Sequence, residues 1–405
     1  MSDILLAGIV FSFLFSMRLA NGFIILYAFN WLIGNNQKTW NLQKTDWVVL
    51  LLMLPWLWEA GSLLYTTDIH EGLKQLEKKI PLTIFPFIIL HHQGGRLARR
   101  DNLFLALTGS VIAVTLFCLI DSTARWIQTG KNTFFWFDLT KVIDFHPTYL
   151  SLIINIICIW IWLTLITKKD EWSLQKKIGA VLELIGFGVI TILLSSKIQT
   201  VIYFAITVVG SFSYYGNLNW KLIIGLVGVG LMLGAIFANK KVKERFMSID
   251  TYSYRLDAPV STFNEFTIRL ALIECSWMLI KERPLWGTGI GDVMSDLDSV
   301  YRKVDYKFGY LDQQDPHDQY LRIILGTGSI GLFLFISSLA VPFWLAIKSR
   351  DFMLIWFILI FGVSFLFESV LERHNGIVIY SILNSVLIFG MEGAEESPVR
   401  KVITS

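Results

Sequence analysis

The sequence is short of charge and of paired cysteines. Only 17% of its 405 residues are charged, against roughly 25% in a soluble domain. The formal net charge of +3 is too small to favour a nucleic-acid binder. The three cysteines, Cys118, Cys158 and Cys275, form no CxxC pair and no Cys/His cluster. This argues against a zinc site and against a disulfide framework.

Two further absences concern the organisation of the chain. The opening residues "MSDILLAGIV" contain no basic segment, so we interpret them as part of a first membrane span rather than a cleaved signal peptide. No internal repeat and no low-complexity linker is evident. We therefore expect one transmembrane domain that covers residues 1–405.

Apolar residues dominate what is present. They make up 54% of the chain, with 30 Phe and 15 Trp, and the mean hydropathy is +0.57. These values predict an all-α polytopic membrane protein with about 12 transmembrane helices, since one span needs about 20 apolar residues. The glycines of "GTGSIG" are expected to kink the tenth span. The twelve candidate spans lie near residues 4–17, 20–34, 47–66, 80–92, 103–120, 148–167, 178–195, 198–215, 221–238, 319–347, 352–370 and 376–391.

The distribution of Lys and Arg predicts the orientation in the membrane. Twelve spans with a cytoplasmic N-terminus place most positive charges of the short loops on one side, which the positive-inside rule makes cytoplasmic. The opposite, periplasmic face carries the longest polar segment, residues 239–318, between spans nine and ten. The cytoplasmic set consists of Lys38, Lys44, Arg96, Arg99, Arg100, Lys168, Lys169, Lys176, Lys177, Lys221, Lys348, Arg350, Arg400 and Lys401.

The long loop has an internal pattern. "TFNE" (Thr262–Glu265) matches a helix capping box, and Pro284 ends the apolar-periodic stretch that follows. We expect this amphipathic helix to pack on the outer ends of the spans, and we expect a second short helix around 292–313. "GTGIG" (Gly287–Gly291) is only a weak match to a phosphate-binding loop. The apolar stripe is formed by Phe266, Leu270, Ile273, Trp277 and Ile280.

Ionisable side chains from distant parts of the sequence share the periplasmic face. Such a group is suited to binding an anionic, polar substrate at the bilayer boundary. Its members are His146, Tyr149, Lys197, Arg255, Arg269, His317, Glu368, Glu372, Arg373 and His374.

Several of these residues also have ordinary structural interpretations. Arg269 follows Glu265 by four residues, the spacing of a surface ion pair on a helix. Lys197 can extend from a helix end towards water. His146 precedes a proline, as a capping residue often does. Glu368 is harder to explain in this way, because an acid inside an apolar run usually faces a protein interior or a cavity.

Two stretches, read together, resemble the O-antigen ligase and O-antigen polymerase superfamily of bacterial inner membranes. They are "IRLALIECSWMLIKERPLWGTGIGD" and "DPHDQYLRIILGTGSIGLFLF". In that family an arginine opens the loop helix, a Pro-Leu-x-Gly-x-Gly turn ends it, and a histidine precedes Tyr-Leu and a Gly-hydrophobic-Gly helix. "FHPTYLS" and "FESVLERHNGI" are similar to its ligase-like branch. The matching positions are Ser195–Lys197, Arg269, Pro284–Gly291, His317–Leu321 and Gly328–Gly331.

The sequence departs from the family pattern at two positions. Lys197 stands where the family commonly has Arg, which replaces a bidentate phosphate ligand by a point charge. Asp318 stands where Asn usually follows the histidine. Both residues keep the polar character of their positions, but the hydrogen bonds that they make are expected to differ.

The resemblance implies a glycosyltransferase that uses a glycan linked to undecaprenyl diphosphate. Its acceptor is lipid A–core or a growing glycan, it works in the lipid bilayer of the bacterial inner membrane, and its active site faces the periplasm. Diphosphate is a good leaving group once cations stabilise its charge, so neither a metal nor another cofactor is expected.

The resemblance also implies residue roles. His317 is the candidate general base, with Arg269 as the second catalytic residue. Arg269 and Lys197, with Arg255 as a lesser candidate, bind the diphosphate. The cavity that holds the glycan is lined by His146, Tyr149, Glu368 and Arg373.

Two alternatives stay open. Ligation to lipid A–core is preferred slightly over polymerisation of O-antigen or exopolysaccharide repeats, since both reactions use the same donor chemistry. The remote alternative is a secondary transporter with Glu59, Glu183 and Glu368 as ion sites. A transporter usually shows internal repeats and charges near the midplane of the membrane, which this sequence does not.

Overall fold

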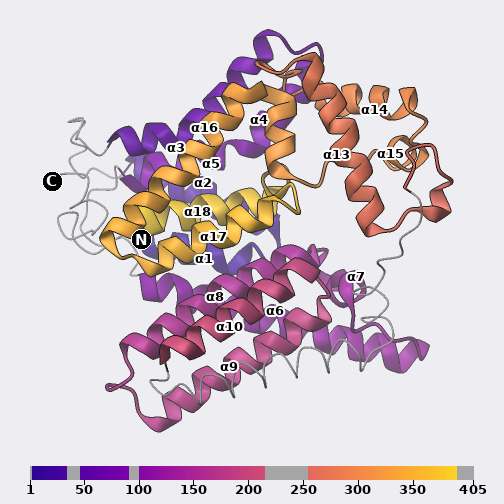
Figure 1. Ribbon diagram of the computed structural model, residues 1–405. Helices are drawn as coiled ribbons and strands as arrows, with labels where there is room; N and C mark the ends of the chain where they lie inside the picture. The colour runs from indigo at the N-terminus through magenta and orange to yellow at the C-terminus, as the bar shows by residue number, and fades with distance from the viewer. Residues whose placement is uncertain (1, 34–45, 91–99, 215–253, 390–405) are drawn as a thin grey trace.

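The computed structural model describes residues 2–33, 46–90, 100–214 and 254–389 (Figure 1), and every regular element within these ranges is a helix. Four of them are long and apolar enough to cross a membrane: α3 (Asp46–Gly61) with its 3₁₀ extension η1 (Ser62–Leu64), α6 (Arg100–Thr129), α8 (Pro147–Thr167) and α16 (Gln319–Ser349). Shorter apolar helices are α2 (Met17–Ile33), α17 (Phe352–Phe365) and α18 (His374–Phe389). Within the described residues, the prediction of an all-helical fold with apolar helices of membrane-spanning length is therefore confirmed.

Other predicted spans also appear as helices. They are α1 (Ser2–Ser12), α5 (Pro81–Leu90), α9 (Leu174–Leu193) and α10 (Lys197–Tyr214). The predicted ninth span, residues 221–238, and the first part of the long loop lie outside the described residues. The number of twelve spans therefore stays a prediction.

Helix α8 forms the centre of one half of the molecule. Helices α6, α9, α10 and α17 pack against it, and most of its side chains are buried. Its polar Asn155 donates to the Gln199 side chain at 2.9 Å, and Gln199 in turn donates to Ser364 at 2.8 Å. These bonds satisfy polar groups in an apolar surrounding and join three helices. In the other half, α5 packs on α18 and α3 on α16.

The shorter elements lie in the connections. They are α4 (Ile69–Lys79), α7 (Trp136–Thr140), η2 (Lys141–Ile143), η3 (Val260–Thr262), α13 (Glu265–Glu282), α14 (Val293–Lys303), α15 (Lys307–Leu311) and η4 (Val370–Glu372). Helices α13, α14 and α15 stand together on the right of Figure 1, where α13 runs steeply across the direction of α8 and α10. They share a small core that includes Ala271, Leu272, Cys275, Leu279, Val293, Leu297, Tyr301 and Tyr306.

The start of the loop helix differs from the prediction by two residues. Asn264, not Thr262, is the N-cap, and its side chain accepts from the backbone of Phe266 and Thr267 at 3.0 and 2.9 Å. The Thr267 hydroxyl accepts from the Asn264 N–H at 2.8 Å, which completes a capping box. Both Thr and Asn are good caps, and the turn η3 places Asn264 rather than Thr262 at the helix start.

The packing face of α13 also differs from the prediction. Most of the expected stripe is exposed: Phe266 by 57%, Ile273 by 48% and Trp277 by 54%. Of that stripe, Ile280 is buried, together with Ala271 and Cys275 from the opposite face. Helix α13 is apolar on nearly all sides, so periodicity cannot select a face. The smaller side chains face α14, where they permit close packing.

The glycine motifs have a structural role. Helix α16 is kinked at Gly328, whose φ of 70° is non-helical, as the sequence predicts. The kink frees backbone carbonyls, and the turn after α13 satisfies them: Thr288 N donates to Leu325 O at 2.8 Å and Gly289 N to Gly326 O at 2.9 Å. A Cβ atom on Gly287 would lie 2.5 Å from Leu325 O. The "GTGIG" turn therefore holds a helix kink rather than a nucleotide.

Candidate active site

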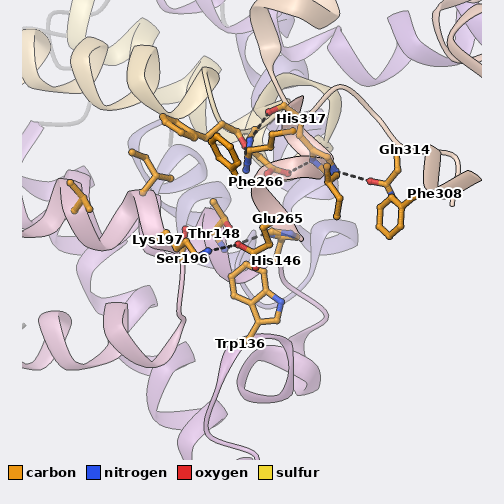
Figure 2. Close-up of a pocket in the computed structure, with 16 residues that line it drawn as sticks. Trp136, His146, Thr148, Ser196, Lys197, Glu265, Phe266, Phe308, Gln314 and His317 are labelled. Atoms are coloured by element: carbon orange, nitrogen blue, oxygen red, sulfur yellow. Dashed lines mark hydrogen bonds and ion pairs between the residues drawn. The ribbon is translucent and has the colours of Figure 1, made fainter. Parts of the chain in front are cut away.

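A cavity of about 560 Å³ lies between the outer loop helices and the ends of the long helices. This volume is within the usual range of ligand sites. The structure brings together five of the residues singled out in the sequence: His146, Lys197, Arg269, His317 and Glu368 all line the cavity. Figure 2 labels His146, Lys197 and His317 among the lining residues. The five residues come from positions as many as 222 residues apart, which the fold brings together at one place.

The starts of four helices meet at this cavity. His146 is the N-cap of α8, Lys197 begins α10, Glu265 begins α13, and His317 directly precedes the N-cap of α16. Each helix start carries partial positive charge from the aligned peptide dipoles. Four such ends, with Lys197 and Arg269 between them, favour the binding of an anionic group.

His317 faces the carboxylate of Glu368, and both side chains line the cavity. Its Nδ1 lies 3.8 Å from Glu368 Oε1, and its Nε2 lies 3.3 Å from Gln314 Oε1. Burial raises the pKa of Glu368, but the neighbouring imidazole of His317 and the charges of His146 and Arg373 outweigh burial, so the pKa is lowered overall. The carboxylate is therefore ionised at neutral pH and is suited to stabilise a protonated His317.

The backbone at His317 is unusual. Its φ is 51°, a left-handed conformation that residues with a Cβ atom adopt infrequently. The next residue, Asp318, caps α16 by accepting from Leu321 N at 2.9 Å. Asn is an equally good cap, so the departure from the family pattern at this position keeps the local structure.

Arg269 bridges the two loops that carry His317 and Glu368. Its guanidinium donates to the backbone oxygen of Phe367 at 2.9 Å and to that of His317 at 3.4 Å. It also lies over the Phe367 ring, 5.5 Å from the centroid. Arg269 thus places its positive charge in the cavity while it holds both loops, a role beyond that of a surface pair with Glu265.

Lys197 pairs with an acid from the loop helix. Its Nζ lies 2.8 Å from Glu265 Oε2, and the two side chains are 35% and 47% exposed. The pair joins the starts of α10 and α13 across the cavity. A half-exposed pair of this kind contributes little stability, so Lys197 can exchange Glu265 for another anion at small cost.

His146 both caps helix α8 and lines the cavity. Its Nδ1 accepts from the Thr148 N–H at 3.2 Å, which is the capping interaction that the following proline suggests. The same ring lies on the cavity wall. Edge contacts with Trp136 and Phe137, at centroid distances of 5.7 and 4.9 Å, hold it in place.

Three predicted residues are not brought to the cavity. Tyr149 is buried behind His146, with ring centroids 5.1 Å apart. Arg255 is 71% exposed and pairs with Asp257 at 2.7 Å. Arg373 lies at the end of η4 and acts on Glu368 through its charge. None of the three is among the lining residues of the cavity.

Sequence reasoning missed the apolar walls. Trp136, Phe266, Phe308 and Phe367 line the cavity and offer aromatic surfaces to a sugar or to a lipid chain. Among 30 Phe and 15 Trp, no sequence signal separates these from the aromatic residues of the core. Trp136 has a φ of 53°, but this backbone conformation is visible in the structure and not in the sequence.

Other chemistries find less support in the described part of the chain. There, no group of three or more His, Cys, Asp or Glu side chains is arranged to hold a metal ion. Of the acids considered as transporter ion sites, Glu59 pairs with Lys79 at 3.0 Å, Glu183 is exposed on α9, and Glu368 lies in the cavity. They do not form one common ion site.

Comparison with known proteins finds a family match over part of the chain. A family model described as O-antigen ligase matches residues 180–336, a range that contains Lys197, Arg269 and His317. No curated protein matches the chain. The family match confirms the resemblance to the O-antigen ligase superfamily. That family suggests a glycosyltransferase-like enzyme of the ligase and polymerase class, with lipid-linked glycan substrates and membrane-embedded action.

Proposed function

We propose that this protein transfers a glycan from undecaprenyl diphosphate to a sugar hydroxyl of lipid A–core, as an O-antigen ligase of the bacterial inner membrane. The observation that carries the proposal is the single cavity in which four helix starts, Lys197 and Arg269 surround His317 and Glu368. Lys197, Arg269 and the helix starts suit the binding of a diphosphate. The pair formed by the His317 imidazole and the Glu368 carboxylate suits proton removal from a hydroxyl. The site faces the periplasm in this proposal.

The chemistry follows from these groups. The acceptor hydroxyl oxygen attacks the anomeric carbon of the donor glycan, and His317 removes the hydroxyl proton. The bond between that carbon and the diphosphate oxygen breaks, and its electron pair leaves with the diphosphate. Lys197, Arg269 and the helix starts stabilise the charge that develops there. Glu368 stabilises the imidazolium that forms, and the proton is then released to water.

A transfer assay tests the function. Purified protein is given an undecaprenyl-diphosphate-linked glycan and lipid A–core, and the product is detected as lipopolysaccharide of increased size. Absence of transfer to either lipid A–core or a glycan acceptor would contradict the proposal. A deletion strain separates the two acceptors: loss of a ligase leaves uncapped core and lipid-linked polymer, whereas loss of a polymerase leaves core with a single repeat unit.

The Lys197–Glu265 pair yields a first prediction. Because Glu265 competes with the diphosphate for Lys197, Glu265→Gln is expected to lower the KM for the donor by about 3–10-fold, the free-energy scale of one partly exposed charge pair. Lys197→Met is expected to raise it, and in the Lys197→Met background Glu265→Gln is expected to have little effect. Steady-state kinetics of the four proteins measures this coupling. An equal effect of Glu265→Gln in both backgrounds would show that the pair does not act at the donor site.

Arg269 yields a second prediction. Arg269→Lys keeps the charge but cannot bond both the Phe367 and the His317 backbone oxygens, since its ammonium is a point charge without the planar fork. We expect kcat/KM to fall by about 10–100-fold, the effect of losing a charged hydrogen bond in the transition state. Arg283→Lys, which changes an exposed arginine at the opposite end of the same helix, is the matched control. Equal activity of the two variants would contradict the bridging role.

A further inference from the structure

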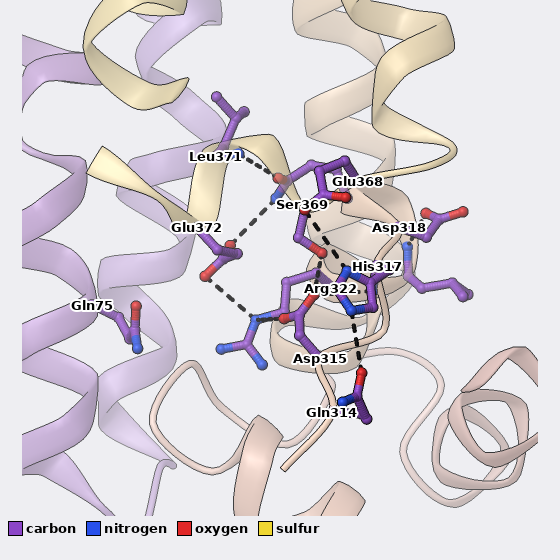
Figure 3. Close-up of polar contacts among 12 residues, drawn as sticks. Gln75, Gln314, Asp315, His317, Asp318, Arg322, Glu368, Ser369, Leu371 and Glu372 are labelled. Atoms are coloured by element: carbon purple, nitrogen blue, oxygen red, sulfur yellow. Dashed lines mark hydrogen bonds and ion pairs between the residues drawn. The ribbon is translucent and has the colours of Figure 1, made fainter. Parts of the chain in front are cut away.

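Asp315 lies in the loop of His317, two residues before it, and also contacts the loop of Glu368. Its Oδ1 accepts from the His317 N–H at 3.0 Å and from the Ser369 hydroxyl (Figure 3). The first bond closes an Asx turn, in which a carboxylate binds the backbone two residues later. That turn holds His317 at its φ of 51°. The second bond holds the residue next to Glu368, so one carboxylate determines the position of both partners of the pair.

A buried chain of charges supports Asp315 from behind. Arg322 Nε lies 4.0 Å from Asp315 Oδ2 and 3.4 Å from Glu372 Oε2. Glu372 Oε1 lies 2.7 Å from Lys79 Nζ, and Lys79 lies 3.0 Å from Glu59. Figure 3 shows Arg322 extended between Asp315 and Glu372. The Arg322 side chain is only 6% exposed and that of Lys79 only 3%.

The chain is tied to the backbone as well. Gln319 donates to Glu372 at 3.3 Å and accepts from Leu371 N at 2.7 Å. The bonds join α3, α4, the start of α16 and η4 to the loops of the site. Buried ion pairs need close partners for every charge, so a shift of one member disturbs the next. This arrangement limits the positions that Asp315 can adopt.

We propose that Asp315 is a positioning residue for His317. It acts through the Asx turn that holds the left-handed backbone of His317, and the Arg322–Glu372–Lys79–Glu59 chain keeps it in place. The inference rests on the proposed function, because it assigns Asp315 a role in aiming the general base. It requires no contact between Asp315 and the substrates.

Substitutions that differ in their hydrogen bonds test the role. Asp315→Ala removes the turn, and we expect kcat to fall by about 100-fold, within the contribution of a positioned general base, with the donor KM unchanged within about twofold. Asp315→Asn keeps an oxygen for the His317 N–H, so a smaller loss of about 10-fold is expected. Asp312→Asn, an exposed acid of the same loop, is the control with wild-type kinetics.

A double substitution distinguishes positioning from a general loss of structure. If Asp315 acts through His317, Asp315→Ala causes no further loss in a His317→Ala background, because residues that act as a unit are not additive. A loss of the same factor in both backgrounds overturns the proposal. So does wild-type kcat in both Asp315 variants. If Asp315→Ala does not fold, the same comparison is made with Asp315→Asn.

The outcome for the proposed function is separate. If the wild-type protein transfers no glycan, or if His317→Ala is as active as the wild type, the proposed mechanism itself is contradicted. If His317→Ala is inactive while both Asp315 variants have the activity of the wild type, only the positioning role fails.

Discussion

The replacement His317→Ala is expected to reduce glycan transfer by about 10²–10⁴-fold, which is the usual contribution of a general base. The reason is geometric: His317 lines the cavity with its Nδ1 3.8 Å from Glu368, so its loss removes the group best placed to accept the acceptor proton. The donor KM is expected to change little, because in the proposed function Lys197, Arg269 and the helix starts bind the diphosphate. The measurement is steady-state transfer with purified protein.

Two further variants make this prediction sharper. His70→Ala removes an exposed histidine of α4 and is expected to retain full activity. Glu368→Gln keeps the shape of the partner but loses its charge, so we expect a smaller fall in kcat, on the order of 10-fold. If His317→Ala retained wild-type kcat in a protein of unchanged melting temperature, His317 would not be the base, whatever its position.

The sequence was sufficient to find the polar residues of the site but not to place all of them. His146, Lys197, Arg269, His317 and Glu368 share one cavity, as their common membrane face predicts. Four of them stand at or beside the end of an apolar run, where the predicted topology places them at the surface of the membrane, and Arg269 lies in the long loop. Tyr149 at the start of a predicted span and Arg255 in the long loop have the same predicted placement, but Tyr149 is buried in the core and Arg255 pairs with its neighbour Asp257.

The sequence singles out Glu59 and Glu372 but not their partners Lys79 and Arg322, for a different reason. Lys79 and Glu372 are 293 positions apart, and no spacing rule links residues in different helices. In the sequence, Lys79 is one of several charges in a polar stretch. Arg322 lies near the start of a predicted helix, where a surface position is expected. Only the folded structure, in which α4 packs against η4 and Arg322 of α16 pairs with Glu372 of η4, shows that these charges are buried together.

The loop helix illustrates the limit of periodicity. A stripe of five large apolar residues predicts a packed face on α13, yet Phe266, Ile273 and Trp277 are exposed, while Ala271 and Cys275 are packed. Both faces are apolar, and the smaller side chains permit the closer approach to α14. The exposed face begins at the cavity with Phe266, where the proposed substrate carries a lipid chain.

Among the substitutions proposed for this protein, Lys79→Met is expected to lower the free energy of unfolding the most. The Lys79 ammonium lies 2.7 Å from Glu372 and 3.0 Å from Glu59, and it also lies over the Trp56 ring. Burial lowers the pKa of Lys79, but the two carboxylates outweigh burial and raise it overall, so the side chain is charged in the folded protein. Its removal leaves two buried acids with insufficient positive charge, at a cost of about 3–5 kcal/mol.

The control lies on the same helix. Lys74 forms an exposed pair with Glu71 at 3.1 Å, so Lys74→Met is expected to cost less than about 1 kcal/mol. Thermal unfolding in detergent compares the two variants. Adding Glu59→Gln to Lys79→Met is expected to restore part of the lost melting temperature, because it removes one of the two uncompensated charges. Equal melting temperatures for Lys74→Met and Lys79→Met would mean that water reaches the chain of charges, and the support that this chain gives to Asp315 would then be lost as well.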